Sequence, residues 1–287
     1  MMKKNLSQKH NLLTGERSSM LRSFVEKEQS GIVDSIFRHS FNIKFENIYF
    51  HVGNYAGGLS VLGITINSLY LSKILDNITL NDLVILKNDI LKIYASNKIF
   101  EVNLLNLNEI ELSIPKLDLS VNQYKMVDSS LKELDLGKKI GMDNNSISHI
   151  MPIFSRINQK HDSELYDLIK YMLGRGKGLT PSGDDMLVGF SSMLVGSGYP
   201  LAERWMNILS EFSELGTTKV SSAYIDAVKH GYISKDLKEL MLNMNSNKST
   251  IICTMQEVLQ MGHTSGADTL FGVSLAINEI IGGSNNG

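Results

Sequence analysis

The pattern of apolar and polar positions changes character once along the chain. Between about residue 31 and residue 115, the two kinds of residue alternate in short runs rich in β-branched and aromatic side chains, as in residues 41–50, 90–94 and 99–104. A period of two is typical of half-buried strands. The Ser-Asn-Lys segment at 96–98 predicts the turn of a hairpin between the last two runs. We therefore expect antiparallel sheet here.

Beyond Pro115 the apolar residues recur at spacings of three and four, which places an apolar stripe on an α-helix. Helices are predicted over 163–173, 186–195, 220–232, 248–261 and 269–281. The sequence thus predicts an α+β fold. A β-rich N-terminal domain covers residues 1–115, and a mostly α-helical C-terminal domain covers residues 116–287. Residues 1 to about 30 are polar and mixed, and a flexible arm or a peripheral helix is expected there.

The composition is that of a folded chain and argues against some classes of binding partner. Of 287 residues, 43% are hydrophobic and 20% charged, as in globular proteins. The net charge of −2 provides no cationic excess for nucleic acid or an acidic membrane. No run approaches the roughly 18 apolar residues of a membrane span, and the basic N-terminus does not continue as a signal peptide. A cytoplasmic protein is expected, with the single cysteine, Cys253, buried in an apolar helix.

One glycine-rich loop combines the features of an anion site. Residues 174–185, Gly-Arg-Gly-Lys-Gly-Leu-Thr-Pro-Ser-Gly-Asp-Asp, lead from one predicted helix into the next. Pro181 suits the first turn of that helix, where its missing N–H is not needed. A helix N-terminus attracts phosphate or carboxylate through its free N–H groups and partial positive charge. The G-x-x-x-x-G spacing of a P-loop occurs here, but Asp184 and Asp185 replace its Lys and Ser or Thr, which excludes nucleoside triphosphate binding of that type.

A second loop repeats this one. Residues 265–272 agree with residues 182–189 at five of eight positions, at a constant offset of 83 residues. Two similar loop-to-helix elements are therefore expected to face one another. Asp185, Asp268 and His263 would then surround one small pocket for a small anionic substrate.

A helix cap is the alternative explanation of each loop. Ser182 followed three residues later by Asp185 matches a capping box, which contributes roughly 1 kcal/mol. A cap needs one carboxylate, so Asp184 is surplus to it. A cap and a ligand site are also compatible, because a rigid element is a suitable support for a site. The catalytic candidates are Asp184, Asp185, His263 and Asp268. The candidate residues for binding substrate or anion are Gly178, Thr180, Ser182, Gly183, Lys219, Ser222, Thr264, Ser265 and Gly266.

If residues 217–224 are helical, Lys219 and Ser222 share one face, which is either an anion-contacting face or a solvated one.

Carboxylates suit Mg²⁺ or Mn²⁺ and imidazole suits Zn²⁺ or Mn²⁺. Nothing in the spacing requires a metal, so no metal ligand and no cofactor is predicted, and a divalent cation stays an alternative.

Three separated segments, 176–185, 220–232 and 261–270, resemble the AllH (YlbF) type subunit of bacterial oxamate carbamoyltransferase. The resemblance covers roughly residues 170 to 280, in the same order. It implies partner subunits of the AllF (FdrA-like) and AllG (YlbE-like) types, with which the family converts oxalurate and phosphate to oxamate and carbamoyl phosphate. It also implies a place in anaerobic allantoin degradation, where carbamate kinase makes ATP from the product.

The loops fit this implied chemistry. Two helix N-termini with Lys219 or Arg175 would hold a carboxylate and a phosphate, and the aspartates would accept hydrogen bonds from the carbamoyl NH2 group. Thr264 or His263 would donate to the oxyanion, and His263 would serve as acid or base. Two other hypotheses stay open: a stand-alone metal-dependent hydrolase or lyase of a small carboxylate, and a non-catalytic structural subunit whose loops only cap helices.

Overall fold

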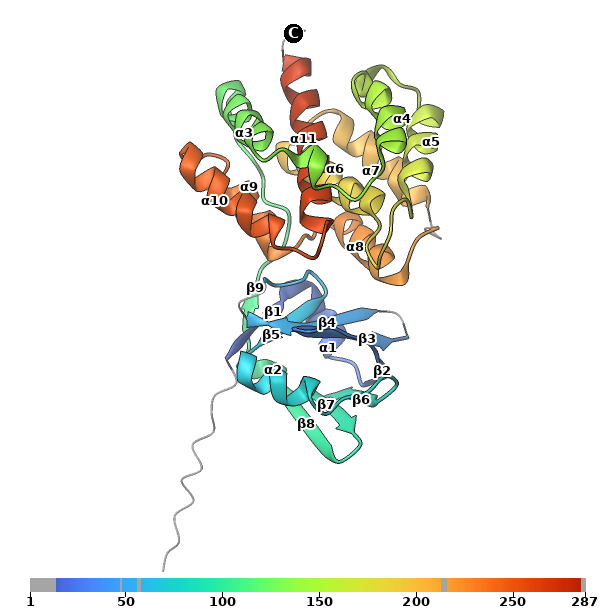
Figure 1. Cartoon of the computed structure of the whole chain (residues 1–287), viewed down its shortest axis with the longest axis vertical. Coiled ribbons are helices and arrows are strands. Elements are labelled where there is room, and N and C mark those ends of the chain that lie inside the picture. Colours follow the sequence, from blue (N-terminus) through green and yellow to red (C-terminus); the bar gives the residue numbers. More distant parts are fainter. Residues whose placement is uncertain (1–13, 47, 56–57, 213–215, 285–287) are drawn as a thin grey trace, which may run out of the picture. The chain divides into compact units, whose positions relative to one another are not determined.

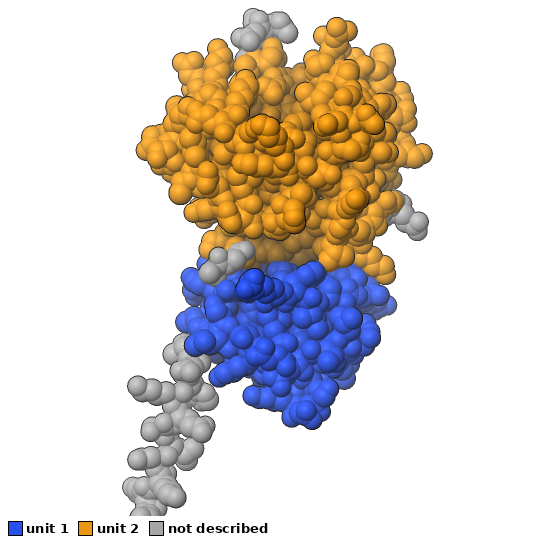
Figure 2. All heavy atoms as spheres, viewed as in Figure 1, with its two compact units in different colours: residues 1–56, 63–110 blue, residues 57–62, 111–287 orange. Residues whose placement is uncertain are grey.

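The chain is described here from a computed structural model, for residues 14–46, 48–55, 58–212 and 216–284 (Figure 1). It divides into two compact units, which Figure 2 colours separately. The first unit comprises Met1–Ala56 and Gly63–Ile110, and the second comprises Gly57–Leu62 and Glu111–Gly287. The first is built on a sheet and the second on helices, so the predicted α+β fold is confirmed.

The described part of the first unit contains one sheet with strand order β8-β7-β6-β2-β3-β4-β5-β1-β9. Its strands are β1 (Gly15–Ser18), β2 (Gln29–Ile36), β3 (Ser40–Phe45), β4 (Tyr49–Asn54), β5 (Gly63–Ile66), β6 (Leu83–Lys87), β7 (Ile90–Ala95), β8 (Lys98–Asn103) and β9 (Asn108–Ile110). The helix α2 (Ser68–Leu75) and the single turn α1 (Arg22–Val25) complete it. Cross-strand pairs such as Phe41 with Val52 and Ile43 with Phe50 are fully buried, which explains why apolar residues alternate along these strands.

The first unit contains both the predicted hairpin and the N-terminal residues. The hairpin between residues 90–94 and 99–104 is confirmed as β7 and β8. The expectation of a flexible arm or peripheral helix over residues 1–30 is corrected for the described residues, because these supply β1, α1 and the start of β2. Residues 1–13 lie outside the described chain. The polar composition did not predict a strand here, because β1 is short and its side chains form ion pairs.

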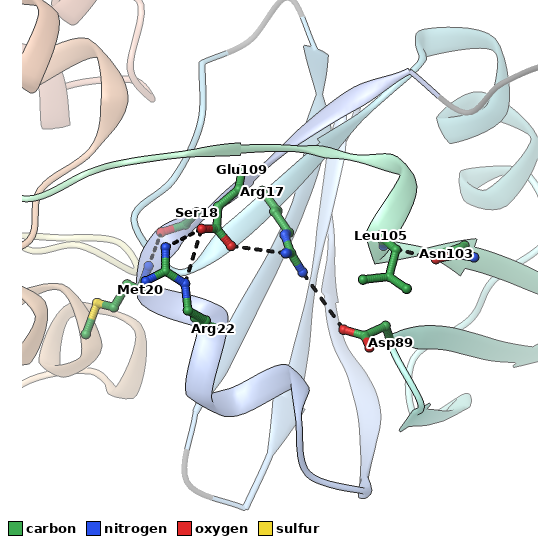
Figure 3. Close-up of polar contacts among 8 residues, drawn as sticks. All are labelled: Arg17, Ser18, Met20, Arg22, Asp89, Asn103, Leu105 and Glu109. Atoms are coloured by element: carbon green, nitrogen blue, oxygen red, sulfur yellow. Dashed lines mark hydrogen bonds and ion pairs between the residues drawn. The ribbon is translucent and has the colours of Figure 1, made fainter.

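Those ion pairs hold β1 in the sheet (Figure 3). Arg17 on β1 lies 3.0 Å from Glu109 on β9 and 3.9 Å from Asp89 in the β6–β7 turn. Arg22, which follows in α1, pairs with the same Glu109. Glu109 and Asp89 both keep about a quarter or more of their side chains exposed, 26% and 30%, so each pair contributes at most about 1 kcal/mol. The cluster links β1 to β9, where Arg17 and Glu109 are register partners, and to the β6–β7 turn.

The described part of the second unit is helical. Its α-helices are α3 (Val121–Glu133), α4 (Asn144–Phe154), α5 (Asp162–Met172), α6 (Ser182–Ser197), α7 (Leu201–Glu211), α8 (Lys219–Lys229), α9 (Lys235–Asn243), α10 (Lys248–Leu259) and α11 (Ser265–Ser284). The five predicted helices are confirmed as α5, α6, α8, α10 and α11. Cys253 on α10 is exposed, which corrects the expectation that it is buried. Of the described helices, none combines the length and the apolar character that a membrane crossing requires.

The pair α6 and α11 forms the centre of this unit (Figure 1). Helices α3 and α10 pack against α11, whereas α5, α7 and α8 pack against α6. The two central backbones touch, because a Cβ atom on Gly189 would overlap the carbonyl oxygen of Thr269, and one on Gly272 would overlap that of Met186. Gly189 and Gly272 are equivalent at the offset of 83 residues, and so are Met186 and Thr269. The two contacts are therefore the same contact made in both directions. Such reciprocity is what a local two-fold relation between the helices produces.

Candidate functional site

The two loops that lead into α6 and α11 are built alike. In each, the second residue of the helix donates its N–H to the carbonyl oxygen of a loop residue: Gly183 to Arg175 at 2.8 Å and Gly266 to Met261 at 3.0 Å. The backbone N–H groups of both glycines are therefore used inside the protein. A Cβ atom on either glycine would overlap backbone of the preceding helix, α5 or α10. These glycines shape the helix starts by letting each loop close tightly.

The start of each helix contacts the carboxyl group of the other. The hydroxyls of Ser265 and Thr180 lie beside the Asp185 carboxyl on α6 and lower its pKa, and those of Ser182 and Thr264 do the same for the Asp268 carboxyl on α11. The Oγ atoms of Thr180 and Ser265 also lie 2.6 Å apart. The two helix N-termini therefore meet, as the sequence repeat predicted.

This crossed arrangement corrects the capping-box interpretation of the first loop. The N-cap residue of α6 is Pro181, and no side chain caps the helix start there. Ser182 is instead the first helical residue, and its hydroxyl faces Asp268 across the contact. Each Ser-x-x-Asp segment thus pairs with the other segment rather than within itself.

The paired carboxyl groups are buried and incompletely hydrogen-bonded. Within the described chain, Oδ2 of Asp185 and Oδ2 of Asp268 have no hydrogen-bond partner, although Oδ1 of Asp268 accepts the N–H of Gly141 at 3.0 Å. Burial raises the pKa of both carboxyls, and the negative charge of Asp268 raises that of Asp185 further. Neighbouring hydroxyls oppose this rise only in part. A buried oxygen without a partner costs free energy, and groups with such perturbed pKa values are concentrated in functional sites.

Asp184 is also buried, but its hydrogen bonds are complete. One oxygen accepts the N–H of Gly174 at 2.9 Å, and the other accepts the hydroxyls of Ser221, at 2.6 Å, and Thr217. Burial raises its pKa, and these three donors lower it again. Asp184 therefore ties the first loop to the start of α8. Ala267 occupies the equivalent position of the second element, so only the first loop has this anchor.

A pocket of about 450 Å³ lies beside the first loop. It is lined by Gly141, Met142, Asp143, Leu173, Gly174, Arg175, Gly176 and Lys177. Gly141 connects this pocket to the carboxyl pair, because its N–H binds Asp268 and a Cβ atom on it would lie 2.5 Å from the Ser182 hydroxyl and 2.8 Å from that of Thr264. A larger residue at position 141 would therefore have to displace these two hydroxyls.

The structure separates the sequence candidates into two sets. It brings together Asp184, Asp185, Asp268, Thr180, Ser182, Gly183, Thr264, Ser265 and Gly266. It leaves four others outside this cluster: Gly178, Lys219 and His263 are exposed, and Ser222 is half-buried on α8 beside Ser221, the residue that reaches Asp184.

Sequence reasoning missed several neighbours of the carboxyl groups. Gly141 lies in a segment with no motif, and Thr217 and Ser221 were overlooked in favour of Ser222. Tyr224 on α8 also belongs here, because burial and, to a smaller extent, the charge of Asp185 raise the pKa of its phenol, which is 2.8 Å from the Ser60 hydroxyl. The only available signal was the conspicuous run of hydroxyl residues at 217–222. Across the described residues, no three His, Cys, Asp or Glu side chains are grouped so as to hold a metal ion.

Comparison with known proteins adds one finding. Residues 172–277 match the family model of the oxamate carbamoyltransferase subunit AllH. The matched range begins at the end of α5 and ends within α11, so it contains both loop-to-helix elements and both paired aspartates. The match confirms the resemblance drawn from the three sequence segments. No solved structure matches the chain.

Proposed function

We propose that this chain is a subunit of an oxamate carbamoyltransferase complex and that its paired helix starts form part of the reaction site. The observation that carries the proposal is the crossed pair Asp185 and Asp268, two buried carboxyls with free oxygens, within the range that matches the AllH model. The proposed reaction converts oxalurate and phosphate to oxamate and carbamoyl phosphate. It operates in purine nitrogen degradation in the cytoplasm, together with subunits of the AllF and AllG types and without a metal or other cofactor.

The proposed step balances as a transfer of one carbamoyl group. A phosphate oxygen forms a bond to the ureido carbon of oxalurate, and the bond from that carbon to the oxamate nitrogen breaks. The leaving nitrogen must receive a proton as its bond breaks. A carboxyl whose pKa is raised by burial, as for Asp185, retains a proton at higher pH than usual and so serves as the general acid.

The second carboxyl has a complementary role in this proposal. Oδ2 of Asp268 has no partner among the described residues and accepts a hydrogen bond from the carbamoyl NH2 group. Its other oxygen is held by the N–H of Gly141, so the carboxyl is already oriented before substrate binds.

Reconstitution with AllF-type and AllG-type partners tests the proposal. Carbamoyl phosphate is measured through ATP formation by added carbamate kinase. We expect turnover of oxalurate only with all three proteins present. Asp185→Asn and Asp268→Asn should each lower kcat by a factor on the order of 100, the usual contribution of one positioned acid or base.

Asp226→Asn is the matched control, because Asp226 is an exposed carboxylate on α8. It should retain full activity. Turnover of oxalurate by the lone chain would favour a stand-alone enzyme instead. Full activity of both paired-aspartate variants in a folded complex would leave this chain a structural subunit.

A further inference from the structure

We propose that the pocket beside the first loop is an oxyanion-binding subsite with Arg175 as its principal contact. The shared chemistry of the ligand is a small group with two or more negatively charged oxygens, as in phosphate or a carboxylate. The inference deepens the proposed function and rests on it for which anion is the natural one. The binding itself requires neither partner subunit nor turnover.

Arg175 is held ready for such a ligand. Its Nε donates to the carbonyl oxygen of Tyr171 at 2.9 Å, and its guanidinium carbon lies 3.7 Å from the centre of the Tyr171 ring. These two contacts fix the plane of the guanidinium group. Its two terminal nitrogens donate to no group in the described part of the chain, and the residue lines the pocket. A planar fork fixed in this way matches the two oxygens of a carboxylate or phosphate.

The loop backbone adds donors next to Arg175. The N–H groups of Gly176, Lys177 and Gly178 have no acceptor among the residues that the structure describes. Gly176 and Gly178 have φ angles of +125° and +94°, which side-chain-bearing residues rarely adopt. Successive unpaired N–H groups in such a loop form a concave cradle for an anion.

Charge in the pocket also favours an anion. Arg175 and Lys177 are its cationic lining residues, and Asp143 is its carboxylate. The oxygens of Asp143 accept the N–H of Ser146 at 2.9 Å and its hydroxyl at 2.7 Å, which caps the start of α4. Asp143 is thus engaged with α4, and the two cationic residues outnumber it in the pocket lining.

The second loop provides an internal comparison. By the equivalent hydrogen bonds of Gly183 and Gly266, Met261 corresponds to Arg175. The second loop is three residues shorter between these bonded positions, since Gly183 bonds a residue eight positions earlier and Gly266 one five positions earlier. It therefore has neither the fork of Arg175 nor the same run of glycines with positive φ. The anion subsite belongs to the first element alone.

Binding of inorganic phosphate and of oxamate to the full-length chain, measured separately by calorimetry, tests this inference. We expect Arg175→Gln to weaken binding of at least one anion about tenfold or more, because the charged hydrogen bonds of the guanidinium are lost. Arg175→Lys, which keeps the charge and loses the fork, should lie between wild type and Arg175→Gln. The control Arg156→Gln changes an exposed arginine near the end of α4 and should bind as wild type.

The two ligands distinguish the source of the anion. Loss of phosphate binding alone assigns the pocket to phosphate, loss of oxamate binding alone assigns it to the carboxylate, and loss of both indicates a general oxyanion site. Thermal unfolding of each variant checks that the fold is intact. Binding of neither anion by wild type, or equal binding by wild type and Arg175→Gln, would overturn the subsite. An inactive complex that still binds the anion through Arg175 would count against the proposed reaction only.

Discussion

The loop-to-helix elements that begin α6 and α11 share a frame and differ in chemistry. Gly183 and Gly266 close the two loops by the same hydrogen bond, and the two paired aspartates contact hydroxyls of the opposite element. The first loop alone has Arg175 and a buried Asp184. The shared features pack two helix starts together and include the paired aspartates of the proposed reaction site. Of the differences, Asp184 anchors the first loop to α8, and Arg175 is the group that we propose for anion binding.

The largest effect is expected at the glycines where α6 and α11 touch. Gly189→Ala and Gly272→Ala should each destabilise the second unit by about 3 kcal/mol or more, because the added methyl group overlaps backbone that cannot move independently. Chemical denaturation measures this. Gly282→Ala, on the same helix α11 but with nothing within 4 Å of the new atom, should be neutral or stabilising by about 0.5–1 kcal/mol. A large difference between the Gly189 and Gly272 variants would contradict the two-fold relation.

A smaller loss of stability is expected at position 184, where the two loop-to-helix elements differ. Asp184→Ala should cost about 2 kcal/mol, because the N–H of Gly174 and the hydroxyls of Thr217 and Ser221 lose their acceptor. The reverse change at the equivalent position, Ala267→Asp, should destabilise as well, since Ala267 is buried. Denaturation midpoints of both variants compare the two positions. If Ala267→Asp were tolerated without loss, the two environments would be interchangeable.

The smallest effect is a stabilisation that depends on pH. Burial raises the pKa of the Asp185 carboxyl well above its ordinary value of 3.8, so folding favours the protonated form. Its contribution is fully present below that ordinary value and is lost as pH rises through the raised pKa. Asp185→Asn, which cannot ionise, should therefore raise the melting temperature near pH 8 by roughly 2–4 °C, the shift for about 1 kcal/mol in a domain of this size.

The same measurement near pH 4 provides the contrast. There the advantage of Asp185→Asn should shrink, because the wild-type carboxyl is then largely protonated. Asp226→Asn, at an exposed position, serves as the reference at both pH values. An advantage for Asp185→Asn that grew as pH fell would contradict the raised pKa.

The sequence predicted elements whose pattern is local. The 3.6-residue period located α5, α6, α8, α10 and α11, and the repeat at 265–272 located the second element and its meeting with the first. The crossed pairing was not predictable, because Ser182 followed by Asp185 has the same spacing in a capping box as in a contact between two helices. The role of Gly141 could not be predicted either, because it depends on the contact with Asp268, which lies 127 residues away in the sequence.

The crossed pairing of helix starts also determines when the candidate site can exist during folding. Thr180 and Ser265 are 85 residues apart, and Gly141 and Asp268 are 127 apart, so no short segment contains a complete set of contacts. Closing such long loops has an entropic cost and is a late, slow event compared with forming single helices. Until α11 docks, Asp185 lacks its hydroxyl partner Ser265, and the apolar faces of α6 stay uncovered. The geometry of the candidate site therefore depends on the docking of α11 and cannot be present in a chain that lacks this contact.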